Sequence, residues 1–235
     1  TRLKAPHGSR HAILYCHGGG YTSGNLGYSR VLSSKLAHAT GYDVLSFEYR
    51  LAPEFPYPAA VEDALRAWDH LMLLGYGARD VVLAGDSAGG NLALVLCHRL
   101  KAAGRRLPGA LVLMSPWTDM TMSGASYAER AESDPMLTPE YIEAVRTAYA
   151  GGRNYASPDL SPLFADLTGF PPTLIQAGDH EILYSDAEML CHALERAGVP
   201  CRFEVSEGMW HVFQMFPLRK AAAAMESVAR FLLER

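Results

Sequence analysis

The sequence predicts an α/β fold in which a mostly parallel central sheet carries helices on both faces. Short runs of apolar and β-branched residues alternate along the chain with longer segments of helical periodicity. Several of the short runs, such as those at 81–84 and 110–114, are almost wholly apolar, as strands buried on both faces are. This alternation favours parallel strands, because each helix returns the chain to the edge of the sheet from which the strand started.

The first half of the chain contains three predicted strands, each followed by a predicted helix. The strands are expected at 11–16, 44–49 and 80–84. The helices are expected at 28–40, 58–74 and 88–103. Glycines follow these helices at positions 41, 75 and 104, where helices commonly end, and Pro58 suits a first helical turn.

The second half continues the pattern after one interruption. Its strands are expected at 110–114, 173–177 and 202–205. Its helices are expected at 138–149, where Thr138 is a typical cap, at 185–197 and at 218–234. The stretch 115–172 is rich in Ser, Thr, Pro and Asp around a single helix. It is too long for an ordinary connection, so we expect it to pack over one edge of the sheet as a lid or pocket wall.

Composition restricts the class of protein. With 235 residues, of which 49% are hydrophobic, the chain is expected to form a single domain over 1–235. A net charge of −4 gives no electrostatic reason to expect nucleic acid or an anionic membrane as a partner. No apolar run is long enough for a membrane span, and the four separated cysteines are expected to be buried free thiols. These features predict a cytoplasmic location, and a homodimer is compatible with them.

The loop after the third predicted strand carries a candidate nucleophile. Ligands of open parallel sheets bind beyond the carboxyl ends of the strands. There, residues 85–89 read Gly-Asp-Ser-Ala-Gly, with small residues on both sides of Ser87. A sharp turn from strand to helix would expose Ser87 at a helix N-terminus, where negative charge is favoured.

The loop after the first predicted strand carries candidate oxyanion donors. It reads His17-Gly-Gly-Gly-Tyr, and a glycine run can turn its backbone N–H groups toward a reacting carbonyl. We assign the donors to Gly18, Gly19 and Ala88, the residue after the serine. His17 is expected to anchor the loop rather than to transfer protons.

Chain order selects the base, because in this type of site serine, acid and histidine follow one another in the sequence. His211 is the histidine that lies after the last predicted strand, in a loop that leads to the final helix. The acid should follow the preceding strand, where 178–183 offer both Glu181 and Asp179. We favour Glu181 and keep Asp179 as the alternative, while Asp186 is expected to cap or brace the next helix.

The ordered motifs resemble the hormone-sensitive-lipase-like branch of the α/β-hydrolase fold, which comprises bacterial carboxylesterases and lactone hydrolases. They include HGGGY at 17–21, GDSAGGNLA at 85–93, SPWTD at 115–119, SDPML at 133–137 and GMWHVF at 208–213. The resemblance implies an α/β-hydrolase domain that hydrolyses short acyl esters through Ser87 and His211, with no cofactor and no metal. Members usually carry a helical cap and two further strands ahead of the glycine run. Only ten residues precede the first predicted strand here, so we expect the cap to be missing and the acyl pocket to be open.

Substrate contacts and rival functions are also predicted. The small-molecule ester or lactone is expected to contact Tyr21, Trp117, Met120, Tyr127, Met136 and Trp210. A metallohydrolase is disfavoured because His180-Glu181 lacks the second histidine of H-E-x-x-H, and the glycine run lacks the spacing of a dinucleotide-binding loop. A catalytically silent binding protein on the same fold remains an alternative, as does an amidase or peptidase that uses the same residues.

Overall fold

A seven-stranded sheet forms the centre of the protein. The structure, a computed structural model, describes residues 2–3 and 10–234. The strands are β1 (Arg2–Leu3), β2 (Ala12–Cys16), β3 (Asp43–Ser46), β4 (Val81–Asp86), β5 (Ala110–Met114), β6 (Thr173–Gly178) and β7 (Cys201–Ser206), in the spatial order β1-β3-β2-β4-β5-β6-β7. Strands β2 to β7 are parallel, and β1 pairs with β3 in the antiparallel sense. The predicted α/β fold with a mostly parallel sheet is confirmed.

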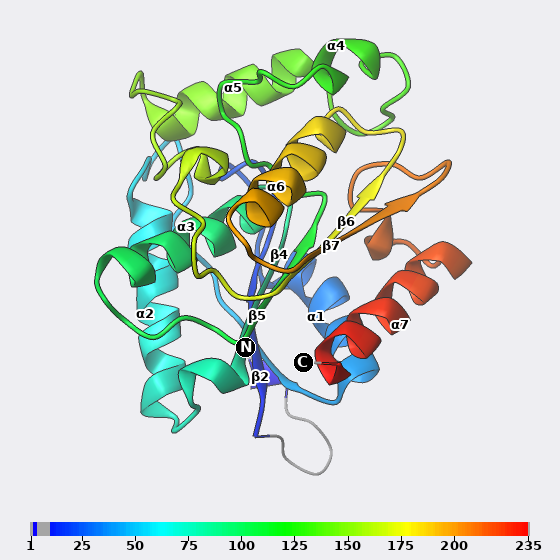
Figure 1. The fold of residues 1–235 in the computed structure, drawn as a ribbon. Coiled ribbons are helices and arrows are strands. Elements are labelled where there is room, and N and C mark those ends of the chain that lie inside the picture. Colours follow the sequence, from blue (N-terminus) through cyan, green and yellow to red (C-terminus); the bar gives the residue numbers. More distant parts are fainter. Residues whose placement is uncertain (1, 4–9, 235) are drawn as a thin grey trace.

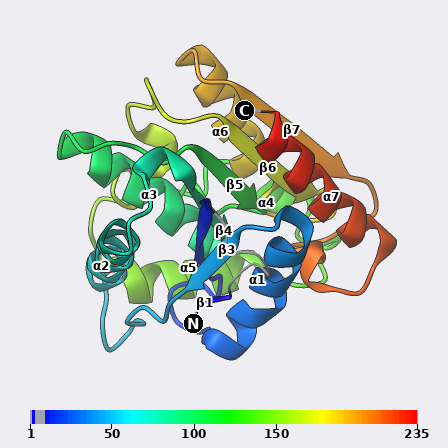
Figure 2. The same ribbon diagram turned by 90° about the horizontal axis from the view of Figure 1, so that it is seen from below.

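Helices cover both faces of this sheet. The α-helices are α1 (Leu26–Thr40), α2 (Ala59–Leu73), α3 (Ala88–Ala102), α4 (Ser126–Glu129), α5 (Pro139–Ala150), α6 (Tyr184–Arg196) and α7 (Arg219–Leu233). Helices α2, α3 and α6 lie on one face, whereas α1 and α7 lie on the other (Figures 1 and 2). Three short 3-10 helices complete the fold: η1 (Ala78–Asp80), η2 (Pro162–Phe164) and η3 (Phe213–Met215).

The core follows from the alternation of side chains along each strand. Leu14 and Leu83 point into the layer of α2, α3 and α6, while their neighbours Ile13 and Val82 point into the layer of α1 and α7. All four side chains have no exposed surface. Because both faces are buried, the strands need apolar residues at every position, which is the pattern that the sequence shows.

Three elements differ from the prediction. The strand expected at 44–49 ends at Ser46, and the chain then leaves the sheet, so that the Tyr49 hydroxyl donates to the carbonyl oxygen of His17 over 2.7 Å. Strand β1 and helix α4 are short elements that carry no periodic signal in the sequence. Segments of two and four residues are too short for a repeating pattern of apolar residues to reveal them.

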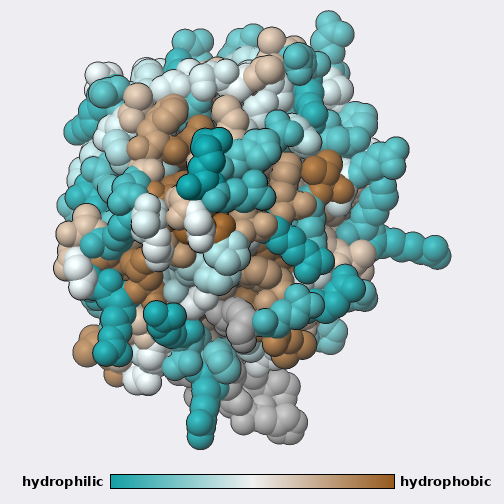
Figure 3. Space-filling view, viewed as in Figure 1, coloured by the Kyte–Doolittle hydropathy of each residue, from teal (hydrophilic) through white to brown (hydrophobic). Residues whose placement is uncertain are grey.

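The parallel arrangement brings the ends of β2, β4, β5, β6 and β7 to one edge of the sheet. Helices α4 and α5 of the 115–172 segment lie beyond this edge (Figure 1), and the end of the segment returns to the opposite edge, where Pro172 pairs with Leu111 at the start of β5. Within residues 10–234, no helix is both long enough and apolar enough to cross a bilayer. The face seen in Figure 3 is mostly covered by hydrophilic side chains, between which apolar side chains form separate patches. All four cysteines are free thiols, three of them buried and Cys201 half-buried.

Candidate active site

Ser87 occupies the tight turn that the sequence predicts between a strand and a helix. Strand β4 ends at Asp86 and helix α3 begins at Ala88. The serine has φ 54° and ψ −124°, a conformation that non-glycine residues rarely adopt. A Cβ atom at Gly89 would lie 2.1 Å from the carbonyl oxygen of Cys16, so only glycine lets α3 approach the end of β2 this closely. The nucleophile candidate therefore sits beside the glycine-rich loop.

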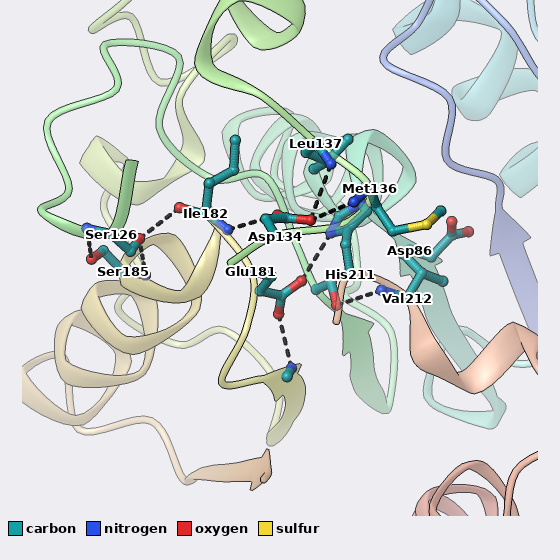
Figure 4. A network of polar contacts seen from close by, with 12 residues as sticks. Asp86, Ser126, Asp134, Met136, Leu137, Glu181, Ile182, Ser185, His211 and Val212 are labelled. Carbon is teal, nitrogen blue, oxygen red and sulfur yellow. Dashed lines mark hydrogen bonds and ion pairs between the residues drawn. The ribbon is translucent and has the colours of Figure 1, made fainter. Parts of the chain in front are cut away.

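His211 and Glu181 form an ion-pair contact in the interior. The Nδ1 atom of His211 lies 2.9 Å from Oε2 of Glu181, and the two side chains are 6% and 0% exposed (Figure 4). The second carboxylate oxygen, Oε1, accepts the N–H of Gly178 over 3.0 Å. Since Nδ1 is engaged by the carboxylate, Nε2 is the ring nitrogen left for a reacting group.

Asp179, the alternative acid, faces a different part of the loop. Its Oδ1 atom accepts the N–H of Gly208 over 2.6 Å and lies 2.7 Å from Nδ1 of His180. Partial burial opposes the ionisation of Asp179, but His180 and the Gly208 N–H outweigh it and hold the pKa of this carboxyl below its usual value. Asp179 thus joins the loop after β6 to the turn that follows β7. Glu181 is the carboxylate that contacts His211.

The loop of His211 is fixed to the neighbouring strand ends. The N–H of Val212 donates to Oγ of Ser115, directly after β5, over 3.0 Å. Ser115 and Val212 have φ angles of 49° and 50°, and together with Ser87 they place three strained residues at one edge of the sheet. Sequence reasoning gave Ser115 no role, although its position in the SPWTD motif was a signal.

Asp134 is a second residue that the sequence analysis missed. Its Oδ2 atom accepts the N–H of Ile182 over 2.9 Å, one residue after Glu181. Its Oδ1 atom accepts the N–H groups of Met136 and Leu137 over 2.8 and 3.0 Å (Figure 4). Asp134 therefore ties the 115–172 segment to the loop that carries Glu181. The SDPML motif marked this position, but a motif does not reveal which N–H groups a carboxylate will accept.

The glycine loop requires one correction. The N–H of Gly18 donates to Oδ1 of Asp86 over 3.0 Å, so it is already used inside the protein and is not free for a substrate. The prediction of Gly18 as an oxyanion donor is therefore wrong. Among the hydrogen bonds of residues 10–234, the N–H groups of Gly19, Gly20 and Ala88 have no partner. The available donors are thus shifted by one residue from the predicted pair of glycines.

His17 is the anchor that the sequence suggests. Its ring stacks on Tyr49 with centroids 4.1 Å apart, and its Nδ1 atom lies 2.7 Å from the Gly18 carbonyl oxygen. Burial lowers the pKa of His17, so the ring is neutral at pH 7. A neutral imidazole packed in this way supports the loop and does not compete with His211 for the serine proton.

The predicted substrate contacts divide into buried and accessible residues. Tyr21 and Trp117 are 0% and 1% exposed and belong to the core, so their prediction as pocket residues is wrong. Tyr21 stacks on Tyr149 of α5 with centroids 3.7 Å apart and donates its hydroxyl to Asn91. Met120 and Tyr127 are buried as well. Met136, which is 51% exposed, and the half-buried Trp210 remain available to a substrate.

Asp186 braces the loop after β5. Its Oδ2 atom accepts the N–H groups of Thr118 and Asp119 over 2.7 and 2.9 Å, and the residue has no exposed surface. Burial is the largest influence on this carboxyl, and it raises the pKa of Asp186 to about 8. Ionisation of Asp186 therefore opposes folding between the pH at which an exposed aspartate loses its proton and about pH 8.

Replacing Asp186 with Asn is expected to change how stability depends on pH. In the wild type, the unfolded chain releases this proton near pH 4 and the folded chain near pH 8, so the free energy of unfolding falls as the pH rises between these values. The variant lacks this loss. The free energy of unfolding of the variant minus that of the wild type should increase by on the order of 1 kcal/mol or more from pH 5 to pH 8, as measured by urea titration. A relative stability that stays flat with pH would show that Asp186 is ionised in the folded protein.

Comparison with known proteins finds close relatives over nearly the whole chain. The family described as the alpha/beta hydrolase fold matches residues 13–215. The chain is 41% identical over 222 residues to an acetyl-hydrolase from Streptomyces hygroscopicus, which covers 94% of this chain and 74% of the relative. It is 36% identical over 232 residues to an esterase from Acinetobacter venetianus, which covers 97% and 77%. The crystal structure of an esterase from the bacterial hormone-sensitive lipase family superposes with a TM-score of 0.96 at 40% identity, and the match covers 99% of this chain and 80% of that one.

Proposed function

Because the chain belongs to the α/β-hydrolase family, and within it to the bacterial hormone-sensitive-lipase-like esterases, we propose that it hydrolyses carboxylic esters through a serine nucleophile and an acyl-enzyme intermediate. The protein is a carboxylic ester hydrolase, as its relatives are. The observation that carries the serine mechanism is the 2.9 Å contact between His211 and Glu181 at the sheet edge where Ser87 lies.

The first half of the cycle acylates the serine. Nε2 of His211 takes the proton of the Ser87 hydroxyl as the oxygen attacks the ester carbonyl. His211 then gives this proton to the leaving alcohol, and the acyl group stays on the serine. Through its contact with Nδ1, Glu181 fixes the tautomer of the ring and stabilises the imidazolium that forms.

The second half releases the acid. Water, activated by the same Nε2 atom, attacks the acyl-enzyme carbonyl, and the proton returns to Oγ of Ser87. Both halves pass through a tetrahedral oxyanion. We assign its donors to the N–H groups of Gly19, Gly20 and Ala88, because the Gly18 N–H is held by Asp86. A donor of this kind contributes roughly 3 kcal/mol to catalysis in other hydrolases.

Small acyl groups or lactones are the proposed substrates. Support comes from the similarity to an acetyl-hydrolase, and from Met136 and Trp210, whose accessible apolar surface suits a short chain. We expect kcat/KM for p-nitrophenyl acetate or butyrate to exceed that for p-nitrophenyl palmitate by at least about tenfold, since each methylene without a fitting pocket costs binding energy. Equal rates for all chain lengths in the presence of detergent would contradict this substrate class.

The nucleophile can be tested without knowing the natural substrate. An alkyl phosphonate or sulfonyl fluoride probe reacts with an activated serine, and peptide mass spectrometry identifies the residue that carries the adduct. We expect a single adduct at Ser87 and loss of esterase activity in proportion to labelling. Inactivation with the adduct at a different residue would refute the serine assignment. Parallel assays with a p-nitroanilide would detect amidase activity by the same residues.

A further inference from the structure

Asp86 is a buried carboxylate that takes no part in the chemical steps of the proposed cycle. It ends β4, stands directly before Ser87 and has no exposed surface. Its oxygens accept hydrogen bonds from three donors: the hydroxyl of Tyr15, the N–H of Gly18 over 3.0 Å and the hydroxyl of Tyr28 over 2.6 Å. Three donors and no acceptor around one carboxyl group are the surroundings of an ionised side chain.

The three donors come from different elements, so Asp86 joins the strand of the nucleophile to the glycine loop. Tyr15 lies on β2, Gly18 in the loop that follows, and Tyr28 on α1. A Cβ atom at position 18 would lie 2.3 Å from Oδ2 of Asp86, so the contact requires glycine there. By holding the Gly18 N–H, the carboxylate fixes the peptide unit that precedes the N–H groups of Gly19 and Gly20.

Burial and hydrogen bonding act on Asp86 in opposite directions. Burial raises the pKa of Asp86, while the hydrogen bonds from the hydroxyls of Tyr15 and Tyr28 favour the ionised carboxylate. Tyr49, which follows β3, and Cys16, which ends β2, also face this carboxylate.

We propose that Asp86 is a positioning carboxylate of this site, which holds the glycine loop so that the Gly19 and Gly20 N–H groups stay free to stabilise the oxyanion while Ser87 attacks. This inference rests on the proposed serine mechanism. Asp86 touches no reacting atom, and it acts through the glycine loop.

The decisive variant is Asp86→Asn, which keeps the contacts and removes the charge. The amide oxygen can accept from Tyr15 and Gly18, and the amide nitrogen can donate to the Tyr28 hydroxyl, which is able to accept. Tyr28→Phe is the matched control, because it removes one donor and leaves the charge. For both variants and the wild type, kcat and KM for p-nitrophenyl acetate are measured from pH 5.5 to 9, with thermal unfolding to verify the fold.

For Asp86→Asn we expect kcat to fall about ten- to a hundredfold with KM changed less than about threefold, since the loss concerns the transition state. The fall in kcat reflects the exchange of charge-assisted hydrogen bonds for weaker neutral ones, which hold the glycine loop less firmly. For Tyr28→Phe, kcat should fall about threefold or more because the carboxylate is less firmly held.

Two outcomes would overturn the proposal. A folded Asp86→Asn protein with the kcat of the wild type removes any positioning role. If Asp86→Asn does not fold, a Tyr28→Phe protein with the kcat of the wild type is sufficient to reject the inference. Phosphonate labelling of the wild type separates these cases from a failure of the serine mechanism, since that failure would leave Ser87 unlabelled in the wild type itself.

Discussion

Ser87→Ala is expected to lower kcat for p-nitrophenyl acetate by at least about a thousandfold, because no other group replaces the hydroxyl as nucleophile. The residual rate should come from substrate binding and from the oxyanion donors, which act on attack by water. Removal of the Oγ atom leaves the backbone of the turn intact, so the variant should fold. Its φ angle of 54° is a strain that alanine bears as well as serine does.

A second serine provides the control for this experiment. Ser34 is an exposed residue of α1, and its hydroxyl donates to the carbonyl oxygen of Arg30 within its own helix. Ser34→Ala should keep the kcat of the wild type. Steady-state rates give kcat for both variants, and circular dichroism verifies that both are folded. A folded Ser87→Ala protein with undiminished kcat would refute the serine mechanism.

Glu181→Gln is expected to lower kcat by about a thousandfold to ten-thousandfold, as loss of the charge does in other serine hydrolases. The amide can still accept the Gly178 N–H, so the loop should keep its shape. It no longer carries the charge that stabilises the imidazolium, and an amide nitrogen turned toward Nδ1 would select the wrong tautomer of His211. KM should change little, since Glu181 has no exposed surface and does not touch the substrate.

Asp179→Asn is the matched control, because it changes the other carboxylate of the same loop. The asparagine oxygen can accept the Gly208 N–H as Asp179 does, so kcat should fall by less than about threefold. The two variants are compared by steady-state kinetics under identical conditions. A larger loss in Asp179→Asn than in Glu181→Gln would make Asp179 the acid and would contradict our assignment.

The sequence predicts the fold well because burial leaves a direct mark on the strands. Runs such as 81–84 and 110–114 are apolar at every position, and the structure places them in the middle of the sheet as β4 and β5. Chain order singled out His211 for a similar reason, since parallel strands must present their following loops at one edge. Both inferences depend on regularities that extend over many residues.

Contacts between side chains that are distant in the sequence could not be predicted in this way. The sequence left the identity of the acid undecided because Asp179 and Glu181 are only two residues apart. In the structure Asp179 accepts the N–H of Gly208, whereas Glu181 contacts His211. Gly18 was assigned wrongly because its N–H is taken by Asp86, which is 68 residues away. Tyr21 was predicted to contact the substrate, but in the structure the ring of Tyr149 stacks on it.

The 115–172 segment is attached to the site on two opposite sides. Asp134 joins it to the loop of Glu181, and the stacking of Tyr149 on Tyr21 joins it to the end of the glycine loop. A hinge motion that lifted this segment away would break both attachments and would disassemble the acid and the anion donors at once. We therefore expect the range of accepted acyl groups to respond to substitution of accessible side chains such as Met136 more than to the mobility of the segment as a whole.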